Sequence, residues 1–516
     1  MIIRKLNHLC FQIPLTFLLT FNFSCDKADF DHTSEINLNP YNIAPLTALV
    51  KVEASVPCTA SIEVLGISPV KQDFSKNAKN LEIPIVGLYP DTENKVVLTL
   101  TSEKGKVIDT LIIKTGPLPN SLPNIVVNTL NRNDMKEGFH GCDTHFANHG
   151  KFHSMPIIFD DQGIIRWYLD LGFNGKMVSP FQRLKDGTLL MVDRDDVFEF
   201  DMLGKLLKKT NIGSNYGMHH DVLELPNGDL LICIGKRNQK INLGGEIINS
   251  DSDFMMHYDR KNGKIVKEWD LAKHLDVNRN DMNFFKGGDW LHMNALEFDE
   301  RDSTIIVSAR NQGLIKVTWD DKLKWIMAPK QNWGRSGRFG NGYDTRPYLL
   351  TAVNKKGNAY NDAIQNGIQS AEDFDFPWAP HAPELLPNGN IIAFDNGAYR
   401  NFNNDNNYSR GAEYKVDEEN MTVTQIWEYG KNLKEAFFST IISDVDFHPG
   451  TNNILITSGF LYPATNHSAK IVEVDYETGK ETFEATLFFK NLGSDGKPGW
   501  GQKDILYRSE RMDLKY

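Results

Sequence analysis

The chain has 516 residues, of which 41% are hydrophobic and 24% charged, and this composition indicates a globular protein long enough for more than one domain. Its formal net charge of −11, without a long basic run after the N-terminus, argues against a nucleic-acid partner, because phosphate backbones are bound by clustered Lys and Arg. The 39 glycines and 22 prolines predict many turns.

Residues 1–24 are typical of a signal peptide. MIIRK (1–5) supplies positive charge, and the apolar run FQIPLTFLLTFNF (11–23) is too short to span a bilayer. Ser24 followed by Cys25 resembles a lipoprotein processing site, at which Cys25 would carry the lipid; a plain secretory signal is the alternative. We therefore expect an exported protein, periplasmic or held at the outer membrane, that meets the membrane only through a lipid anchor.

The next two segments are predicted to be a tether and a small domain. Residues 25–37 are polar and indicate the tether. Short segments of period 2 with turn residues between them, such as LTALVKVEASV (46–56), predict a β-sandwich over residues 38–120. PLPNSLPN (117–124) is typical of a linker.

Three cysteines follow Cys25 in the sequence: Cys58, Cys142 and Cys233. An odd, widely spaced set is neither a disulfide framework nor a CxxC metal site. The sequence therefore allows one disulfide bridge at most.

Two kinds of hairpin alternate from residue 125 to residue 516. The first kind often ends in aromatic residues, and it recurs at 156–171, 197–209, 254–271, 314–328, 412–430 and 469–489. The second kind has a polar turn, and it recurs at 181–193, 220–235, 292–310, 381–397 and 443–459, with a degenerate copy at 503–514. Six alternations predict an all-β fold, a six-bladed β-propeller, in which the C-terminal strands complete the blade that begins near residue 156. Seven blades are the alternative.

Histidines stand at a fixed offset from the turns of the second kind of hairpin. His220 and His381 each precede the Pro of a Pro-Asn-Gly turn by six residues. Ser443 shares this offset, Asn294 falls close to it, and His292 lies two residues before Asn294 on the same face of a strand. Because the inner strands of a propeller line its central channel, these side chains are predicted to converge on one pocket, with Arg310 at the far end of its hairpin.

Three chemistries suit such a cluster. A metal site could combine the imidazoles with Asp221 or Asp395. A hydrolase could use a histidine as the base toward water, and a group-transfer enzyme could use a histidine as the nucleophile. The spacing of the residues does not choose among them.

The motifs around these residues resemble those of a known family, the bacterial aryl-sulfate sulfotransferases that use no nucleotide donor. The most specific are HHDVLELPNGD (219–229), DWLHMNALEFD (289–299), IIVSARNQGLIKV (305–317), PHAPELLPNGNIIAFDNG (380–397) and YSRGAEYKVDEENMTVTQIWEYGK (408–431). The resemblance covers the mature chain. It implies transfer of a sulfuryl group from aryl sulfates to phenols, without a metal or another cofactor, and it leaves a homodimer open.

The resemblance also implies roles for single residues. His381 corresponds to the nucleophile that would carry the sulfuryl group, and His220, His292 and Arg310 correspond to other catalytic residues. Asn294, His219 and Ser443 are implied at the substrate, with Ser439 and Thr440 competing with Ser443. A metal-dependent propeller hydrolase of the lactonase kind and a non-catalytic binding propeller are the alternatives.

The remaining histidines and two tryptophans receive weaker predictions. His140, His145, His149 and His153 are interpreted as ordinary loop residues, with a metal site as the alternative, and His257 and His448 as surface residues. Trp290 and Trp378 are expected near the mouth, where they either stack on an aryl ring or pack between blades.

Overall fold

The computed structural model describes residues 30–172, 177–250, 253–279, 282, 287–461, 467–497 and 499–516. The predicted signal peptide and Cys25 lie outside the described residues. No helix within these described ranges is long and apolar enough to cross a membrane. Cys58, Cys142 and Cys233 are buried, free thiols.

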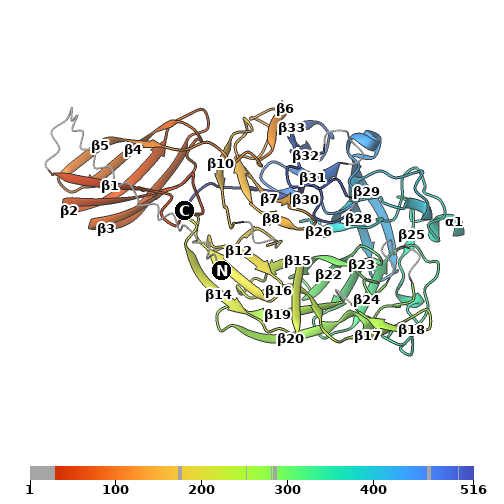
Figure 1. Ribbon diagram of the computed structural model, residues 1–516. Helices are drawn as coiled ribbons and strands as arrows, with labels where there is room; N and C mark the ends of the chain where they lie inside the picture. Colours follow the sequence, from red (N-terminus) through yellow and green to blue (C-terminus); the bar gives the residue numbers. More distant parts are fainter. Residues whose placement is uncertain are drawn as a thin grey trace, which may run out of the picture.

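Five antiparallel strands form the N-terminal domain. They are β1 (His32–Leu38), β2 (Ala48–Val64), β3 (Val70–Ile85), β4 (Glu93–Ser102) and β5 (Gly105–Lys114). Along one edge, β2 pairs β3; along the other it pairs β1 with its first half and β4 with its second. Alternate residues of β2 are buried, as its period-2 pattern predicts. Figure 1 shows this domain in red beside the larger ring of strands.

The predicted tether is partly wrong, because residues 32–38 form β1 rather than a polar linker. β1 pairs only with β2, as the first strand of the sheet order. A strand at the edge of a sheet has fewer neighbours to pack against, so the polar segment HTSEINL can form it with few apolar side chains.

Sheets of four or five strands make up the rest of the described chain, and six of them are present there. Sheet 1 contains β7 (Phe139–Ala147), β8 (Phe152–Ser154), β9 (Ile157–Phe159), β10 (Ile165–Tyr168) and β34 (Ile505–Met512). Sheet 2 contains β11 (Gln182–Arg183), β12 (Leu189–Asp193), β13 (Asp196–Phe200) and β14 (Leu206–Asn211). Sheet 3 contains β15 (Tyr216–Glu224), β16 (Leu230–Lys236), β19 (Phe254–Asp259) and β20 (Lys264–Asp270).

The other three sheets follow in chain order. Sheet 4 contains β21 (Met293–Asp299), β22 (Thr304–Ala309), β23 (Gly313–Thr318) and β24 (Leu323–Met327). Sheet 5 contains β25 (Thr351–Ala352), β26 (His381–Leu385), β27 (Ile391–Asp395), β28 (Arg410–Asp417) and β29 (Thr422–Tyr429). Sheet 6 contains β6 (Asn124–Leu130), β30 (Asp444–His448), β31 (Asn453–Leu461), β32 (Ser468–Asp475) and β33 (Glu481–Phe488). A short ribbon of β17 (Lys240–Leu243) and β18 (Glu246–Asn249) and the helix α1 (Asp362–Gln365) lie in the connections.

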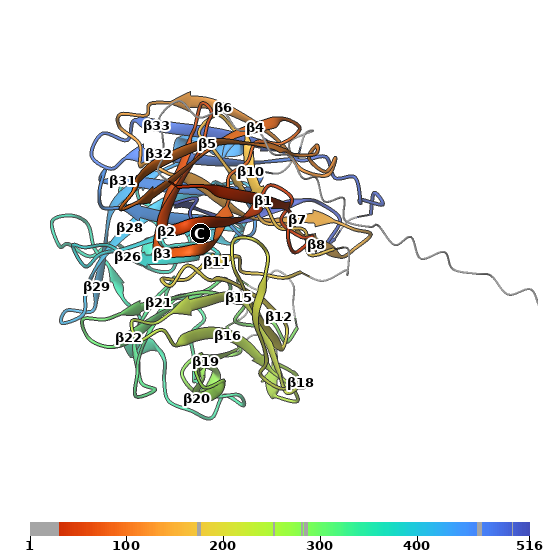
Figure 2. The same ribbon diagram turned by 90° about the vertical axis from the view of Figure 1, so that its left-hand side faces the viewer.

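The sheets follow one another around a common centre, which confirms the predicted propeller class (Figure 1). Apolar side chains fill the space between neighbours: Ile306 of sheet 4 and Ile391 of sheet 5, for example, belong to one buried cluster. Seen from the side, the N-terminal domain lies in front of the ring (Figure 2). Gln72 of that domain hydrogen-bonds the backbone of the C-terminal residue Tyr516.

Both ends of the propeller sequence close the ring. β34 pairs β7, so the prediction that the C-terminal segment completes the blade begun near residue 156 is confirmed. At the other end, β6 pairs β33 and becomes the fifth strand of sheet 6. The segment 503–514 is a single strand rather than a degenerate hairpin, and its partner is β7, which the sequence analysis treats as a loop.

Several histidines predicted in loops or on the surface are buried in strands. His140 and His145 lie on β7 and His153 lies on β8, and all three are fully buried. His257 and His448 are also buried, on β19 and β30. Of this set only His149 lies in a turn. The loop prediction for this histidine-rich stretch is wrong because the partner strand of β7 comes from the far end of the chain.

Candidate active site

The inner strands of four sheets are irregular at the level where the histidines stand. The register shifts between Met218 and Val222 in β15, between Met293 and Ala295 in β21, between His381 and Glu384 in β26, and between Leu506 and Ser509 in β34. β-Bulges of this kind bend a strand and re-aim its side chains, and they are frequent beside active sites.

Left-handed backbone accompanies these irregularities. His220 has φ 58°, His292 has φ 49° and Ala382, next to His381, has φ 46°. Ser443, directly before β30, has φ 92°. Non-glycine residues adopt this conformation at a cost of about 1–3 kcal/mol each, so the surrounding structure must hold them there.

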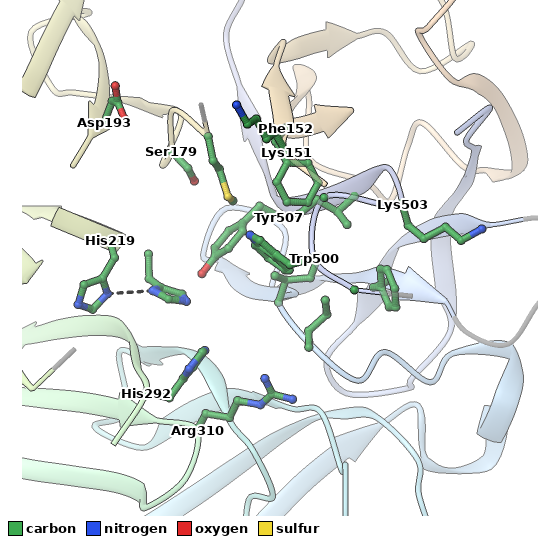
Figure 3. Close-up of a pocket in the computed structure, with 18 of the residues that line it drawn as sticks. Lys151, Phe152, Ser179, Asp193, His219, His292, Arg310, Trp500, Lys503 and Tyr507 are labelled. Carbon is green, nitrogen blue, oxygen red and sulfur yellow. Dashed lines mark hydrogen bonds between the residues drawn. The ribbon is translucent and has the colours of Figure 1, made fainter. Parts of the chain in front are cut away.

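The predicted histidines surround one cavity of about 850 Å³. His219, His220, His292, Arg310 and His381 all line it, so sheets 3, 4 and 5 contribute to the same space (Figure 3). The imidazole rings of His220 and His292 are 4.9 Å apart between centroids, nearly perpendicular to each other. Residues at a fixed offset from the hairpin turns therefore lie around one cavity, although they are far apart in the sequence.

Asn294 and Ser443 are buried beneath this cavity and are not among its lining residues. Asn294 donates a hydrogen bond of 2.8 Å from Nδ2 to the carbonyl oxygen of Pro380, the residue directly before His381. Ser443 donates from Oγ to Oγ of Ser439 at 2.9 Å. Both residues brace the backbone that carries the site, and the contact of Asn294 and Ser443 with a substrate stays a prediction.

His381 is held through one ring nitrogen. Its Nδ1 lies 2.6 Å from Oδ1 of Asn396 and 3.3 Å from the carbonyl oxygen of Ala379. The ring is 3% exposed and lines the cavity. Burial, together with the positive charge of Arg310, holds the pKa of His381 well below 6.5. The ring is therefore neutral at neutral pH.

His292 is held by a carboxylate instead. Its Nδ1 lies 2.5 Å from Oδ2 of Asp289. Burial by itself raises the pKa of Asp289, but the hydrogen bond and the charge of His292 outweigh it and lower this pKa overall. Asp289 therefore stays ionised beside the imidazole.

His219 and His220 form a pair, with their Nδ1 atoms 2.8 Å apart (Figure 3). Burial lowers the pKa of His219 to about 4, and burial with the neighbouring His292 lowers the pKa of His220 well below 6.5. Both rings are thus neutral at neutral pH, and one of the two Nδ1 atoms donates to the other.

Arg310 supplies the positive charge of the site. Burial lowers its pKa to about 10, so the guanidinium remains charged at neutral pH. Its Nη2 donates to the carbonyl oxygen of Thr440 at 3.1 Å, and its backbone N donates to the carbonyl oxygen of His292 at 3.0 Å. A fixed guanidinium beside the imidazoles can bind an oxyanion with two parallel N–H groups.

Sequence reasoning missed a further wall of the cavity. Tyr507 on β34 lines it, and its hydroxyl is directed toward the paired histidines and has no hydrogen-bond partner within the described residues (Figure 3). Burial raises the pKa of Tyr507 well above 10, so the hydroxyl can donate a hydrogen bond to a ligand. Phe152 and Trp500 add aromatic surface, with their rings 4.9 Å apart in an edge arrangement. Aligning β34 with the inner strands of the other sheets would have found Tyr507.

The carboxylates of the metal alternative are engaged elsewhere. Asp395 forms buried ion pairs with Arg400 and Arg410, and Asp221 forms an ion pair with Arg508 at 2.9 Å. Within the described part of the chain, no group of three or more His, Cys, Asp or Glu is arranged to hold a metal ion. Trp290 and Trp378 are fully buried and do not line the cavity, so they pack within the fold rather than stack on a ligand.

Comparison with known proteins decides the family. Residues 124–492 match the family model described as arylsulfotransferase (ASST). The chain belongs to the arylsulfotransferase family. Residues 35–116 match the model of the Ig-like domain of the same family, which corresponds to the N-terminal strands β1 to β5. The resemblance stated from the motifs is confirmed, and with it the prediction of a transferase.

Two relatives match most of the length of this chain. Arylsulfate sulfotransferase AssT of Escherichia coli O6:H1 is 27% identical and covers 92% of this chain and 92% of its own. Arylsulfate sulfotransferase AssT of Lelliottia amnigena is also 27% identical and covers 86% of this chain and 88% of its own.

Proposed function

We propose that this arylsulfotransferase moves a sulfuryl group from an aryl sulfate ester to an acceptor phenol through a covalent sulfohistidine on His381. The observation that carries the proposal is the neutral imidazole of His381, held at Nδ1 and lining a cavity that also contains a fixed guanidinium. A neutral imidazole with one nitrogen engaged has a lone pair on the other, which makes it a nucleophile.

The first half-reaction forms the covalent intermediate. Nε2 of His381 attacks sulfur, an N–S bond forms, and the bond from sulfur to the aryl oxygen breaks with its electron pair left on that oxygen. Arg310 donates hydrogen bonds to the sulfuryl oxygens, whose negative charge persists through a loose in-line transition state. His292, when protonated at both nitrogens, gives the Nε2 proton to the departing phenolate.

The second half-reaction reverses these steps with a different phenol. The acceptor oxygen attacks sulfur as its proton passes to His292, and the N–S bond breaks and returns its electron pair to Nε2 of His381. Because the acceptor occupies the place that the first phenol left, we expect ping-pong kinetics. The aromatic surface of Phe152, Trp500 and Tyr507 suits the aryl groups of both substrates.

The scheme uses only residues of this chain, and no metal or other cofactor takes part in it. We also propose that the enzyme acts after export, held at the membrane by lipid on Cys25, as residues 1–25 of the sequence suggest. The proposed reaction in the cavity does not depend on this lipid anchor.

The test uses 4-nitrophenyl sulfate as donor and phenol as acceptor. Release of nitrophenolate beyond one equivalent per enzyme should depend on added phenol. A hydrolase would release nitrophenolate without phenol, and a binding propeller would release none. The enzyme can also be incubated with a donor that carries a labelled sulfuryl group. Mass spectrometry of its peptides should then place the label on His381.

Replacement of the nucleophile gives the first prediction. His381→Asn should lower kcat by about 10³-fold or more, because the proposed reaction passes through a covalent bond to the His381 imidazole. The matched control is His257→Asn, which removes a buried histidine bonded to Asp229 at 2.8 Å in sheet 3, outside the cavity, and should keep kcat within about twofold. Retention of most transfer activity in the His381 variant would contradict the sulfohistidine.

A further inference from the structure

Asn396 follows β27 and fixes its side-chain amide from both ends. Its Nδ2 donates to the carbonyl oxygen of Ser439 at 2.8 Å and to that of Ile442 at 2.9 Å. Two carbonyl oxygens can only accept, so the amide nitrogen must face them and Oδ1 must face His381. The residue is fully buried and does not line the cavity.

This orientation determines which nitrogen of His381 carries the proton. Oδ1 of Asn396 lies 2.6 Å from Nδ1, and the carbonyl oxygen of Ala379 lies 3.3 Å from the same atom. Both neighbours are acceptors, so Nδ1 must be the donor. In the neutral ring, the lone pair is then on Nε2, the nitrogen that Asn396 and Ala379 leave unengaged, in a ring that lines the cavity.

We propose that Asn396 is a positioning residue that holds His381 in its Nδ1–H tautomer and so presents the Nε2 lone pair to the sulfuryl group. The inference rests on the proposed function, in which His381 is the nucleophile. The amide acts through the imidazole and does not touch the substrate. When Nε2 bonds to sulfur the ring becomes positive, and the amide oxygen keeps its hydrogen bond to Nδ1–H throughout.

The choice of an amide rather than a carboxylate fits a nucleophile. A carboxylate at this place would favour the imidazolium, which has no lone pair and cannot attack. The neutral amide oxygen orients the proton without adding charge. At His292 the partner is instead the carboxylate of Asp289, so the two imidazoles differ in the charge beside them.

The same contacts align the nucleophile with the guanidinium. Asn396 is anchored to the loop before β30 through Ser439 and Ile442, and Arg310 donates to Thr440 in that loop. Ser409 strengthens the junction, because its Oγ donates to the carbonyl oxygen of Asn396 at 2.7 Å. One loop of sheet 6 therefore sets the position of groups from sheets 4 and 5.

The test begins with the unaltered full-length protein, and a variant serves only to assign the signals. Nitrogen NMR of protein labelled with ¹⁵N-histidine reports which ring nitrogen carries the proton, and the signals of His381 are assigned by their loss in His381→Asn. At pH 7.5 the ring should be neutral and protonated on Nδ1. A neutral ring protonated on Nε2 would overturn the proposal whether or not the protein transfers sulfuryl groups.

Kinetics of Asn396→Ala then separate positioning from substrate contact. With 4-nitrophenyl sulfate and phenol, kcat should fall by about 10²-fold while KM for the donor changes by less than about threefold, because the ring loses its orientation but the cavity keeps its lining. The NMR spectrum of the variant should show His381 with its proton on Nε2 or shared between both nitrogens. Unchanged kcat, or an unchanged Nδ1–H tautomer, would overturn the proposal.

The matched control is Asn453→Ala. Asn453 is also buried, and its Nδ2 donates to the carbonyl oxygen of Asp134 at 2.6 Å and to Glu473 at 2.7 Å, away from the cavity. Its loss should lower thermal stability by a similar amount and leave kcat within about twofold. An equal loss of kcat in both variants would show a general structural effect and overturn the positioning role. If the unaltered protein transfers no sulfuryl group, the proposed function fails and the NMR result still decides the tautomer.

Discussion

The histidines that line the cavity differ in the hydrogen-bond partners of their imidazole rings. His381 donates to an amide, His292 pairs with a carboxylate, and His220 shares a hydrogen bond with His219. The amide beside His381 orients the ring without adding charge, whereas the carboxylate beside His292 brings a negative charge next to the imidazole. Chemically similar residues in one cavity can therefore take different roles in transfer.

The low pKa of His381 predicts an unusual response to acid. A histidine with the ordinary pKa of about 6.5 is neutral in roughly nine-tenths of molecules at pH 7.5 and in about a quarter at pH 6. Burial and Arg310 hold the pKa of His381 well below 6.5, so protonation should begin only at a lower pH. The single-turnover rate of nitrophenolate release should therefore not fall between pH 7.5 and pH 6.

The measurement is the rate of the nitrophenolate burst after rapid mixing of the enzyme with saturating 4-nitrophenyl sulfate. Each sample is quenched in alkali before detection, so that nitrophenolate absorbs equally whatever the reaction pH. Circular dichroism over the same range shows that the protein stays folded. A fall of about fourfold toward pH 6 would mean that His381 titrates like an exposed histidine.

At the scale of the strand, bulges aim the site. In β26 the two residues Ala382 and Pro383 oppose a single position of β27, since His381 pairs Phe394 and Glu384 pairs Ile392. A proline lacks a backbone N–H and is tolerated in sheets at such bulges. The bulge lets His381 face the cavity while Glu384 and Leu385 continue the inner strand.

Substitution at Ala382 tests this role. Ala382 has φ 46°, where a β-branched side chain clashes with the backbone. Ala382→Val should lower the free energy of unfolding by about 1–3 kcal/mol and also lower kcat, because the strand relieves strain by moving His381. Ala382→Gly, which is permitted at positive φ, should stay within about 1 kcal/mol of the original stability and keep kcat. Denaturant unfolding and the nitrophenolate assay measure both, and equal behaviour of the two variants would contradict the argument.

At the scale of the whole molecule, the cavity differs in charge from the rest of the protein. The chain carries a formal net charge of −11. Among the described residues that line the cavity, four are cationic side chains, Lys151, Arg194, Arg310 and Lys503, and two are carboxylates, Asp193 and Asp289. An aryl sulfate is an anion, so the cavity attracts it while the outer surface repels it.

This contrast predicts a salt dependence for one substrate only. Raising the ionic strength from about 0.05 to 0.5 M shortens the Debye length severalfold, so kcat/KM for the aryl sulfate donor should fall by about threefold or more. The kcat/KM for neutral phenol as acceptor, measured at saturating donor below the pKa of the phenol, should change little. Lys151→Gln with Lys503→Gln should weaken the salt dependence, and an equal response of donor and acceptor would exclude electrostatic steering.

Local patterns in the sequence carried much of the fold. Strand hairpins of both kinds were found because each contains its own alternation and its own turn. The offset of His220 and His381 from a turn was enough to predict their convergence, since a radial repeat returns equivalent positions to the same height. The motif resemblance added the family and the candidate nucleophile.

The predictions that were wrong or missing concern residues whose strand partners or contacts come from distant segments of the chain. The sequence predicts a loop at β7 because the segment is polar and histidine-rich, and one of its partner strands, β34, comes from the other end of the chain. Tyr507, which lines the cavity, lies on β34. Asn396 lies within the motif 380–397, but its contact with His381 depends on two carbonyl oxygens in the loop before β30.

The sequence by itself determined the strand pattern and the repeated hairpins, because these follow from local periodicity and turn chemistry, and the motif resemblance added the link to sulfuryl transfer. Tertiary structure alone decided which nitrogen of His381 is engaged by a neighbour and which side chains are buried outside the cavity lining. A proton's place on an imidazole depends on the acceptor within hydrogen-bond distance, and for His381 that acceptor was brought there by the packing of one blade against the next.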